Sequence, residues 1–370
     1  MPYGTVNADL MTTSDGVSSS GLYGFKNRIY NGQMVIDQRN AGASVTPASG
    51  TYTLDRWFAN IAQSSKFSVQ QTPSATETGF AVRVAAGFTN YLATTSTSAY
   101  SVLTADYFSM YQIIEGNNIS DLAWGTASAK TVTLSFYVRS SLTGTFGGAL
   151  NNSGFTRSYP FSYSISVANT WEQKTITVAG DTSGTWLTTN GIGMVVSLSL
   201  GAGSTYSGTA NAWAGSTLTQ PTGATSVVGT NGATFYITGV QLEKGSTATS
   251  FDYRPYGTEL ALCQRYYWIT TGTSGNGYPT YGAGGFLSTT NFCAFIPYPV
   301  QMRSSPTISI GTSLFITTSG FPSVSAIGAN YSNQYSGRVE FTTSSSTAGF
   351  GGALGINNTT TSFIDASAEL

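Results

Sequence analysis

The residues that could do acid–base or metal chemistry are few, and histidine is missing altogether. The 370-residue chain has 16 Asp and Glu, 15 Lys and Arg, and no His. Histidine is the commonest general base and the commonest metal ligand. Serine is abundant, but no imidazole is present to activate it, and no Gly-x-Ser-x-Gly elbow stands at a strand-to-helix junction. Triad hydrolases and His-ligated metalloenzymes are therefore excluded.

Paired carboxylates are the remaining route to hydrolysis. A glycosidase needs two acids roughly 5–10 Å apart, and the densest acidic cluster without a neighbouring Lys or Arg is Asp106, Glu115 and Asp121. These acids have no strict short spacing, and their surroundings are ordinary polar loop. Other acids lie next to basic residues, such as Asp252 near Arg254. We therefore expect ion pairs and hydrogen bonds, predict no catalytic residue, and keep a polysaccharide depolymerase as a minor alternative.

Metal and cofactor sites have no sequence support either. The chain contains no Asp-x-Asp-x-Asp-Gly loop and no CxxC, the patterns expected of calcium and zinc sites. The glycine-rich segments 282–285 and 349–355 lack the Lys-Ser/Thr of a phosphate loop. Cys263 and Cys293 stand in apolar runs and are expected to be small buried residues outside any disulfide. We predict no metal ligand and no cofactor-binding residue.

Aromatic and uncharged polar residues are the strongest positive signal. Aromatics make up 13% of the chain, and charged residues only 8% against about 25% in an ordinary domain. Tyr and Trp stack on sugar rings and give contact area at low entropic cost, while amides and hydroxyls bond to sugar hydroxyls. The candidates for glycan or receptor binding lie in two Gly/Tyr-rich loops: Tyr278, Tyr281, Tyr331, Asn333 and Tyr335. Trp186, Trp213 and Tyr91 are further candidates, whereas Trp57, Trp124 and Trp171 are expected in the core.

The net charge of the chain indicates which kinds of partner it can bind. A formal charge of -1 lacks the basic footprint of a nucleic-acid binder. The N-terminus shows no basic and apolar signal-peptide regions, and no window approaches the ~18 apolar residues of a membrane span. We expect a soluble protein with no nucleic acid partner and no membrane insertion.

Strand patterns dominate the elements that must position these side chains. Segments rich in β-branched and aromatic residues alternate with Gly/Asn/Ser turns, which is typical of an all-β fold. The clearest segments are 131–138, 175–178, 193–200, 233–242, 307–310, 313–317 and 337–342. The alternation changes parity at Gly239, which predicts a β-bulge. One short helix is expected over 258–267, capped by Thr258.

Three regions follow from these patterns. Residues 1–30 lack periodicity and are expected to form an extended arm. Residues 31–254 hold enough strands for an antiparallel jelly-roll β-sandwich of about eight strands. A Pro/Gly break at residues 254–257 introduces a smaller β-sandwich domain over 255–370.

Several phrases in these regions resemble virion proteins of tailed bacteriophages, namely tail fibres and appendages with a carbohydrate-binding-module-like jelly roll. The phrases are 31–40 (NGQMVIDQRN), 52–57 (YTLDRW), 130–138 (KTVTLSFYV), 170–174 (TWEQK), 179–182 (AGDT), 237–245 (ITGVQLEKG), 248–255 (ATSFDYRP), 259–267 (ELALCQRYY), 299–306 (PVQMRSSP) and 366–370 (ASAEL). The arm, 4–16 (GTVNADLMTTSDG), resembles the short stretches with which phage fibres attach or intertwine.

This resemblance implies a non-enzymatic homotrimer assembled into the virion in the host cytoplasm. The arm, with Val6 and Leu10, would join other virion proteins, and Arg265, Tyr266 and Tyr267 would pack at the domain junction or between protomers. The C-terminal domain would be the tip that meets a host cell-surface glycan. A head fibre or capsid decoration protein fits the same sequence, and the resemblance leaves a structural calcium ion open. A free carbohydrate-binding module of a secreted enzyme is disfavoured, because no catalytic partner domain is visible.

Overall fold

The computed structural model describes residues 25–76, 87–272, 278–318, 320–344, 346–359 and 361–370. It forms two compact units, of which the first ends at Glu259 and the second begins at Leu260. The division falls inside helix α2 (Tyr256–Gln264), a few residues after the predicted boundary at 254/255.

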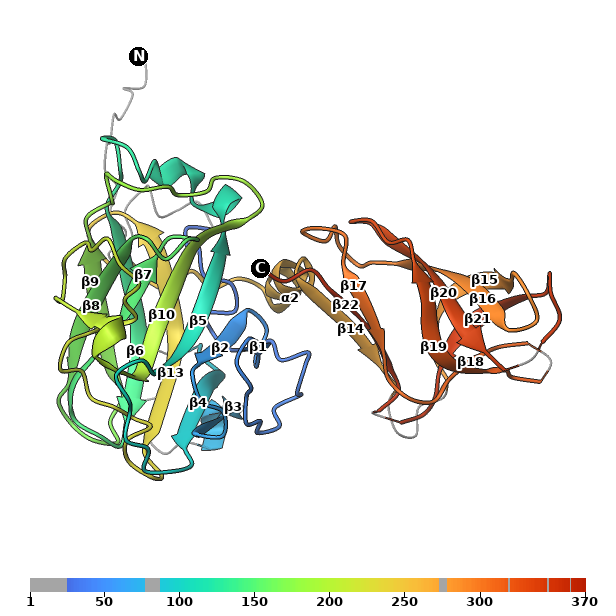
Figure 1. Ribbon diagram of the computed structural model, residues 1–370, viewed down its shortest axis with the longest axis horizontal. Helices are drawn as coiled ribbons and strands as arrows, with labels where there is room; N and C mark the ends of the chain where they lie inside the picture. Colours follow the sequence, from blue (N-terminus) through green and yellow to red (C-terminus); the bar gives the residue numbers. More distant parts are fainter. Residues whose placement is uncertain (1–24, 77–86, 273–277, 319, 345, 360) are drawn as a thin grey trace, which may run out of the picture. The chain divides into compact units, whose positions relative to one another are not determined.

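The N-terminal unit is a jelly-roll β-sandwich of two antiparallel sheets (Figure 1). One sheet has the order β1 (Thr51–Tyr52), β2 (Trp57–Ile61), β5 (Tyr107–Glu115), β10 (Ile192–Ala202), β7 (Gly144–Asn151) and β8 (Ser158–Ile165). The other has the order β3 (Phe67–Pro73), β4 (Asn90–Ser96), β13 (Thr234–Lys244), β6 (Val132–Ser140) and β9 (Glu172–Val178). A short parallel pair, β11 (Ser207–Gly208) and β12 (Gln220–Pro221), and the 3-10 turns η2 (Ser74–Thr76), η3 (Gly116–Asn118), η4 (Ser120–Leu122) and η5 (Ser204–Tyr206) complete the unit. The all-β, antiparallel jelly-roll prediction is confirmed, with more strands than expected.

The alternation of side chains along the strands explains the core between the two sheets. On β13, Phe235 and Ile237 point inward before the bulge and Val240 and Leu242 after it, all fully buried. The register shifts between Thr238 and Gln241, so the predicted bulge at Gly239 is confirmed. The extra residue of the bulge shifts the alternation of side chains, so that odd-numbered positions face the core before it and even-numbered positions face the core after it.

Residues 25–30 belong to this sandwich, which corrects the predicted end of the arm. Ile29 is fully buried in the core. Asn27 donates from Nδ2 to the carbonyl of Val240 and accepts from the amide of Leu242, and the Arg254 guanidinium donates to the carbonyls of Asn27 and Ile29. Val6 and Leu10 lie outside the described residues.

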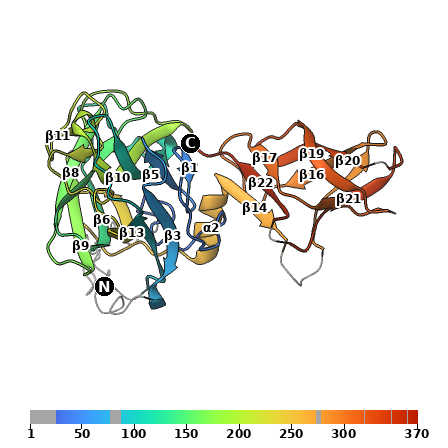
Figure 2. The same cartoon turned by 60° about the horizontal axis from the view of Figure 1, so that its bottom comes forward.

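The C-terminal unit contains a closed antiparallel barrel (Figure 2). Around the barrel the order is β15 (Thr280–Phe286), β16 (Asn291–Pro297), β20 (Ser336–Thr343), β19 (Ser323–Asn330), β18 (Leu314–Ile316) and β21 (Gly351–Ile356). A three-stranded sheet of β14 (Tyr267–Thr271), β22 (Phe363–Ser367) and β17 (Thr307–Ile310) completes the unit. The expected smaller sandwich is thus a barrel beside a small sheet, because β21 pairs with both β15 and β18 and closes the ring.

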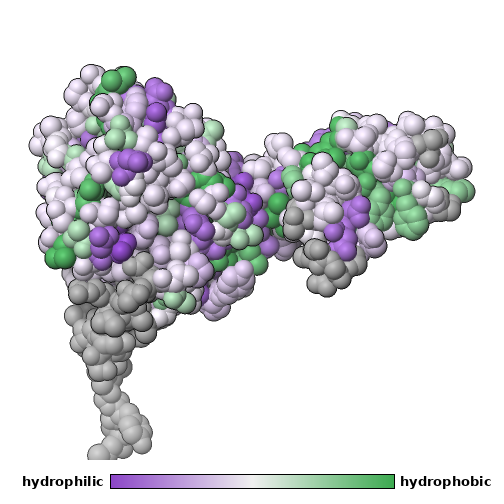
Figure 3. Space-filling model, turned by 90° about the horizontal axis from the view of Figure 1, so that it is seen from below, coloured by the Kyte–Doolittle hydropathy of each residue, from purple (hydrophilic) through white to green (hydrophobic). Residues whose placement is uncertain are grey.

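Inward-facing side chains fill the barrel as the alternation predicts. Phe292 and Ile296 of β16, Phe341 of β20 and Leu354 of β21 are fully buried. Closure of the barrel removes the sheet edges, and the outward-facing positions include exposed aromatic residues such as Phe295 of β16, which is 56% exposed. Figure 3 shows one face of the molecule, on which strongly hydrophilic residues are scattered among weakly polar ones, as the low charge content requires.

The helix and the cysteines are close to expectation. Helix α2 begins at Tyr256, directly after Pro255, so Thr258 lies inside the helix instead of capping it. Cys263 is buried and Cys293 half-buried, and these two described residues are not joined by a disulfide. Among the described helices, none is long and apolar enough to cross a membrane.

Candidate functional site

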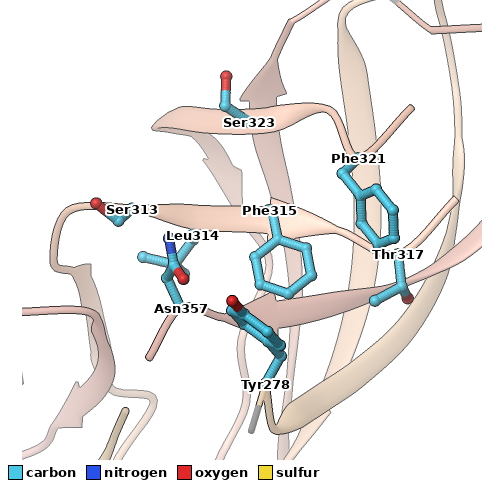
Figure 4. A pocket seen from close by; sticks show the side chains of 8 residues that line it. All are labelled: Tyr278, Ser313, Leu314, Phe315, Thr317, Phe321, Ser323 and Asn357. Atoms are coloured by element: carbon cyan, nitrogen blue, oxygen red, sulfur yellow. The ribbon is translucent and has the colours of Figure 1, made fainter. Parts of the chain in front are cut away.

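A pocket of about 680 Å³ lies on the wall of the barrel in the C-terminal unit (Figure 4). It is lined by Tyr278, Ser313, Leu314, Phe315, Thr317, Phe321, Ser323 and Asn357. Its volume lies within the range of roughly 300–1,000 Å³ that small-molecule sites occupy. No side chain in this lining carries a charge, so the pocket is built for an uncharged ligand.

Three aromatic rings form the apolar part of the pocket. The centroids of Tyr278 and Phe315 are 5.8 Å apart, and those of Phe315 and Phe321 are 6.0 Å apart, both pairs edge-to-face. Tyr278 is 63% exposed and Phe321 65% exposed. Figure 4 shows the three rings next to one another, with Ser313 and Asn357 at one end and Thr317 at the other. Without a ligand, the Tyr278 and Phe321 rings leave apolar surface in contact with water, which is typical of a binding surface.

Local structure positions the rings of Phe315 and Phe321. Phe315 is the central residue of β18, and its ring packs where a Cβ on Gly355 would stand, 2.5 Å from Phe315 Cζ. Any residue larger than glycine at position 355 would displace that ring. Phe321 ends the turn between β18 and β19 with a φ of 43°, a left-handed conformation that is strained for an aromatic residue. Strain held in this way often accompanies a binding site.

The polar groups of the pocket are available to a ligand. The hydroxyls of Tyr278, Ser313 and Ser323 and the Nδ2 of Asn357 make no hydrogen bond to a described residue. The Thr317 hydroxyl, in contrast, is bonded to the backbone of Ala353 as donor and acceptor, at 3.0 and 3.1 Å. Apolar rings can stack on the C–H face of a sugar, and the unengaged hydroxyl and amide groups beside them can bond its hydroxyls.

Tyr278 is the only predicted binding residue in this pocket. Tyr281 is half-buried and packs against the barrel core. Asn333 accepts hydrogen bonds from the amides of Tyr335 and Ser336, at 2.8 and 3.0 Å, so its side chain shapes the hairpin turn. For Tyr281 and Asn333 the structure therefore replaces a predicted binding role with a structural one.

Tyr331 and Tyr335 are exposed but belong to a separate surface. They are 59% and 64% exposed in the hairpin between β19 and β20, and the Arg338 guanidinium lies 4.8 Å from the Tyr331 ring centroid. The pocket includes Ser323 at one end of β19, and this hairpin follows Asn330 at the other end. At about 3.3 Å per residue, the two ends are roughly 25 Å apart. The two tyrosine loops cannot form one site.

The predicted assembly residues are engaged inside their own unit. Tyr266 is fully buried, and its carbonyl accepts from the amide of Ala368. Tyr267 is 5% exposed, and its hydroxyl donates to Asp365 at 3.1 Å. The Arg265 carbonyl accepts from the amide of Arg303 at 2.8 Å. Both tyrosine side chains are buried within one chain, and their expected packing at the domain junction or between protomers stays a prediction.

The acidic residues considered for catalysis are dispersed. Asp106 precedes β5 and accepts from the Tyr100 hydroxyl at 2.7 Å, whereas Glu115 ends the same strand. Nine residues of strand separate them by roughly 30 Å, far beyond the roughly 5–10 Å that a pair of glycosidase acids needs. Asp121 forms ion pairs with Arg28 at 2.8 Å and Lys244 at 3.4 Å. The three do not form one acidic cleft.

Several aromatic candidates are structural. Tyr91 and Trp186 are buried, and Trp124, Trp186 and Trp213 pack edge-to-face with centroids 4.7 to 5.7 Å apart. The expected core residues Trp57, Trp124 and Trp171 are buried. A pocket of about 190 Å³ on the outer face of the six-stranded sheet is lined by Asn60, Tyr107, Tyr111, Phe155, Tyr206, Thr217 and Thr219.

Sequence reasoning missed Phe315, Phe321 and Asn357. Phe315 lies in a predicted strand whose outward face could have been noticed, because Leu314 and Ile316 fill the inward positions. Phe321 follows Gly320 in a turn, where a large apolar residue is unusual. In the part of the chain that the structure describes, no group of three or more Cys, Asp or Glu is placed to hold a metal ion.

Comparisons with known proteins give structural likeness only. No family model and no curated protein matches the sequence. A family 4 carbohydrate-binding module is similar at 15% identity over 59% of this chain and 99% of its own, with a TM-score of 0.28. The enzymatically active domain of tailspike protein 4 of bacteriophage CBA120 is similar at 10% identity over 60% of this chain and 22% of its own, with a TM-score of 0.32.

A third similar structure is the family 11 carbohydrate-binding module of a cellulosomal cellulase of Clostridium thermocellum. Its identity is 12% over 56% of this chain and 99% of its own, with a TM-score of 0.26. Likeness at these scores carries no argument about function.

Proposed function

We propose that the chain binds a neutral glycan through the barrel pocket and acts as a non-enzymatic subunit of a bacteriophage tail fibre or tail appendage. The observation that carries the binding proposal is the set of three rings, Tyr278, Phe315 and Phe321, beside unengaged polar groups in an uncharged pocket. The rings would stack on the C–H face of a sugar, and Ser313 and Asn357 would bond its hydroxyls.

The uncharged lining supports binding without turnover. Glycoside hydrolysis needs a general acid and a second carboxylate beside the scissile bond, and the lining has neither. The proposal needs no cofactor. A structural calcium ion, if bound, would stabilise the fold without taking part in glycan recognition.

The attachment role is supported by the phage-fibre-like phrases and by the composition. A chain with 8% charged residues can pack against copies of itself with few charges to desolvate. We propose a homotrimer in the virion, attached through residues 1–24, with the barrel meeting the host surface. If the protein is attached to the head of the particle and not to the tail, the proposed role of the pocket is the same.

Titration of the full-length chain with neutral oligosaccharides tests the binding proposal. Maltohexaose, cellohexaose, xylohexaose and purified neutral O-polysaccharide serve as probes. Removing an exposed ring that stacks on the ligand weakens binding by about 1–3 kcal/mol, so Phe321→Ala should raise Kd about 5- to 150-fold. Tyr335→Ala removes an equally exposed ring from the other end of the barrel and should leave Kd unchanged. Equal effects of the two substitutions would contradict the proposal.

Two further measurements test the assembly proposal. Analytical ultracentrifugation should show a trimer that persists on dilution, and a stable monomer would refute it. Antibody labelling of purified particles should mark the tail; labelling of the head would establish the alternative position.

A further inference from the structure

A second group of aromatic residues lies on the outer face of the five-stranded sheet in the N-terminal unit. Phe88, Tyr91 and Trp171 are buried there, and Tyr137 and Phe251 pack against them half-buried. This cluster is distinct from the core between the sheets. So much aromatic area on the solvent side of a sheet needs a reason beyond core formation.

Three of these rings, Phe88, Tyr137 and Phe251, surround a pocket of about 280 Å³ together with Tyr253. Its lining is Phe88, Ser135, Tyr137, Gln173, Gly239, Thr249, Ser250, Phe251 and Tyr253. From the Phe88 centroid, Phe251 lies 4.9 Å away, Tyr253 5.2 Å and Tyr137 5.7 Å. Tyr253 is 44% exposed and stands at the rim. The volume suits one sugar ring and is too small for a longer segment of a chain.

The β-bulge of β13 creates this space. Gly239 has a φ of +62°, and a Cβ there would come within 2.7 Å of the Phe88 ring and 3.1 Å of the Tyr137 ring. Glycine is therefore needed both for the left-handed backbone and for the room beside the rings. The bulge thus places the two rings without filling the space in front of them.

Hydrogen bonds hold the far wall in position. The Gln241 side chain accepts from the amide of Asp252 at 2.8 Å and donates to the carbonyl of Ser250 at 3.3 Å. Glu243 accepts from the amide of Thr249 at 2.9 Å. The segment that carries Phe251 and Tyr253 is therefore fixed before any ligand arrives, which reduces the entropy lost on binding.

The hydroxyl of Ser135 is accessible in the pocket and has no protein partner among the described residues. The residue as a whole is 5% exposed, and its Oγ, which is not fully buried, makes no hydrogen bond to a described residue. A hydroxyl in this state is available to bond a polar occupant of the pocket. The Gln173 amide, directly across from Tyr137 on β9, is exposed and equally unengaged within the described chain. No charged side chain lines the pocket.

We propose that this pocket is a second, independent glycan site that binds a single neutral sugar residue. The Phe88, Tyr137 and Tyr253 rings contact its apolar face, and Ser135 Oγ and the Gln173 amide bond its hydroxyls. The site shares the ligand class of the proposed function but none of its residues. The chain would then be bivalent for glycans, and its avidity for a polysaccharide would exceed the affinity of either site.

The test uses the full-length chain carrying Tyr278→Ala and Phe321→Ala, so that the barrel pocket is silent. Saturation-transfer NMR with the methyl glycosides of glucose, galactose, mannose and N-acetylglucosamine should still detect binding of at least one of them. Adding Ser135→Ala and Gln173→Ala should weaken that binding at least about tenfold. Thr177→Ala, at an exposed position further along β9, opposite Thr133 and outside the pocket, is the matched control and should have no effect.

Two outcomes would overturn the proposal. One is no binding of any of these glycosides by the barrel-silenced chain. The other is binding that Ser135→Ala with Gln173→Ala leaves unchanged while thermal unfolding shows the fold intact; water alone would then be the partner of Ser135. Either result leaves the barrel proposal standing, since that rests on the effect of Phe321→Ala in the otherwise unaltered chain.

Discussion

The two units use aromatic residues in opposite ways. In the jelly roll, Trp124, Trp186 and Trp213 pack against one another, and each indole N–H is bonded, to Lys130 O at 2.7 Å, to Asp181 Oδ2 at 3.3 Å and to Ala179 O at 3.0 Å. In the barrel, Tyr278 and Phe321 are more than 60% exposed and pack only at their edges.

This difference separates stability from recognition. A buried ring contributes to folding through the apolar area it removes from water. An exposed ring contributes little to folding, but it gives a ligand rigid apolar surface at low entropic cost. Aromatic content alone, high in both units, does not distinguish the two roles; burial does.

The largest effect should come from breaking the tryptophan cluster. Trp186 is 7% exposed, so Trp186→Ala should destabilise the jelly roll by about 3–5 kcal/mol. Phe321→Ala should change the stability of the barrel by less than about 1 kcal/mol, because that ring is mostly in water. Urea unfolding followed by hydrogen exchange, which resolves the two units, measures both. Similar destabilisation by the two substitutions would remove the distinction between the clusters.

Ion pairs in the two units should also differ in how much they stabilise the fold, but by less than the aromatic residues do. Arg157 donates twice to Asp181, both at 2.7 Å, and the Asp181 residue is 1% exposed. Asp181→Asn should therefore cost about 1.5–3 kcal/mol, the usual loss for hydrogen bonds to a buried charge. In the barrel, Arg338 and Glu340 pair at 3.1 Å with the Arg338 side chain 54% exposed, and Glu340→Gln should cost about 0–1 kcal/mol. Chemical denaturation of both variants checks the order.

The smallest effect concerns acid stability. Burial alone would raise the pKa of Glu172, but Lys174 at 2.6 Å and the amides of Val167 and Ser166 outweigh it and lower this pKa. A carboxyl whose pKa is lower in the folded chain stabilises it above the unfolded pKa of about 4.3. That contribution is lost as the pH falls through the folded pKa. Glu172→Gln should flatten the acid side of a plot of stability against pH, and an unchanged slope there would show that the pair contributes nothing.

Local patterns were enough to predict much of the jelly roll. The segments 131–138, 193–200 and 233–242 became β6, β10 and β13, and the parity change at Gly239 marked a real bulge. These features depend on alternation along one strand, which the sequence contains directly. Closure of the barrel depends on which strands pair across long loops, and no local pattern encodes that β21 joins β15 to β18.

The candidate site was only partly predictable for the same reason. Tyr278 was found because it is a tyrosine in a Gly-rich loop. Its partners Phe315 and Asn357 lie far along the chain, and only the pairing of β18 with β21 brings them together. Tyr266 and Tyr267 look like recognition residues by type, but the strand pairing of β14 with β22 buries Tyr267 and the fold buries Tyr266.

The central claim is that the barrel pocket, and not its tyrosine hairpin, binds a neutral glycan. Surface plasmon resonance of the full-length chain over immobilised neutral polysaccharide tests it most directly, with two matched double variants at low and high salt. We predict that Tyr278→Ala with Phe321→Ala raises Kd at least about tenfold, that Tyr331→Ala with Tyr335→Ala leaves Kd unchanged, and that salt changes Kd little because no charge lines the pocket. A Kd that the first pair leaves unchanged, or that rises steeply with salt, would contradict the account.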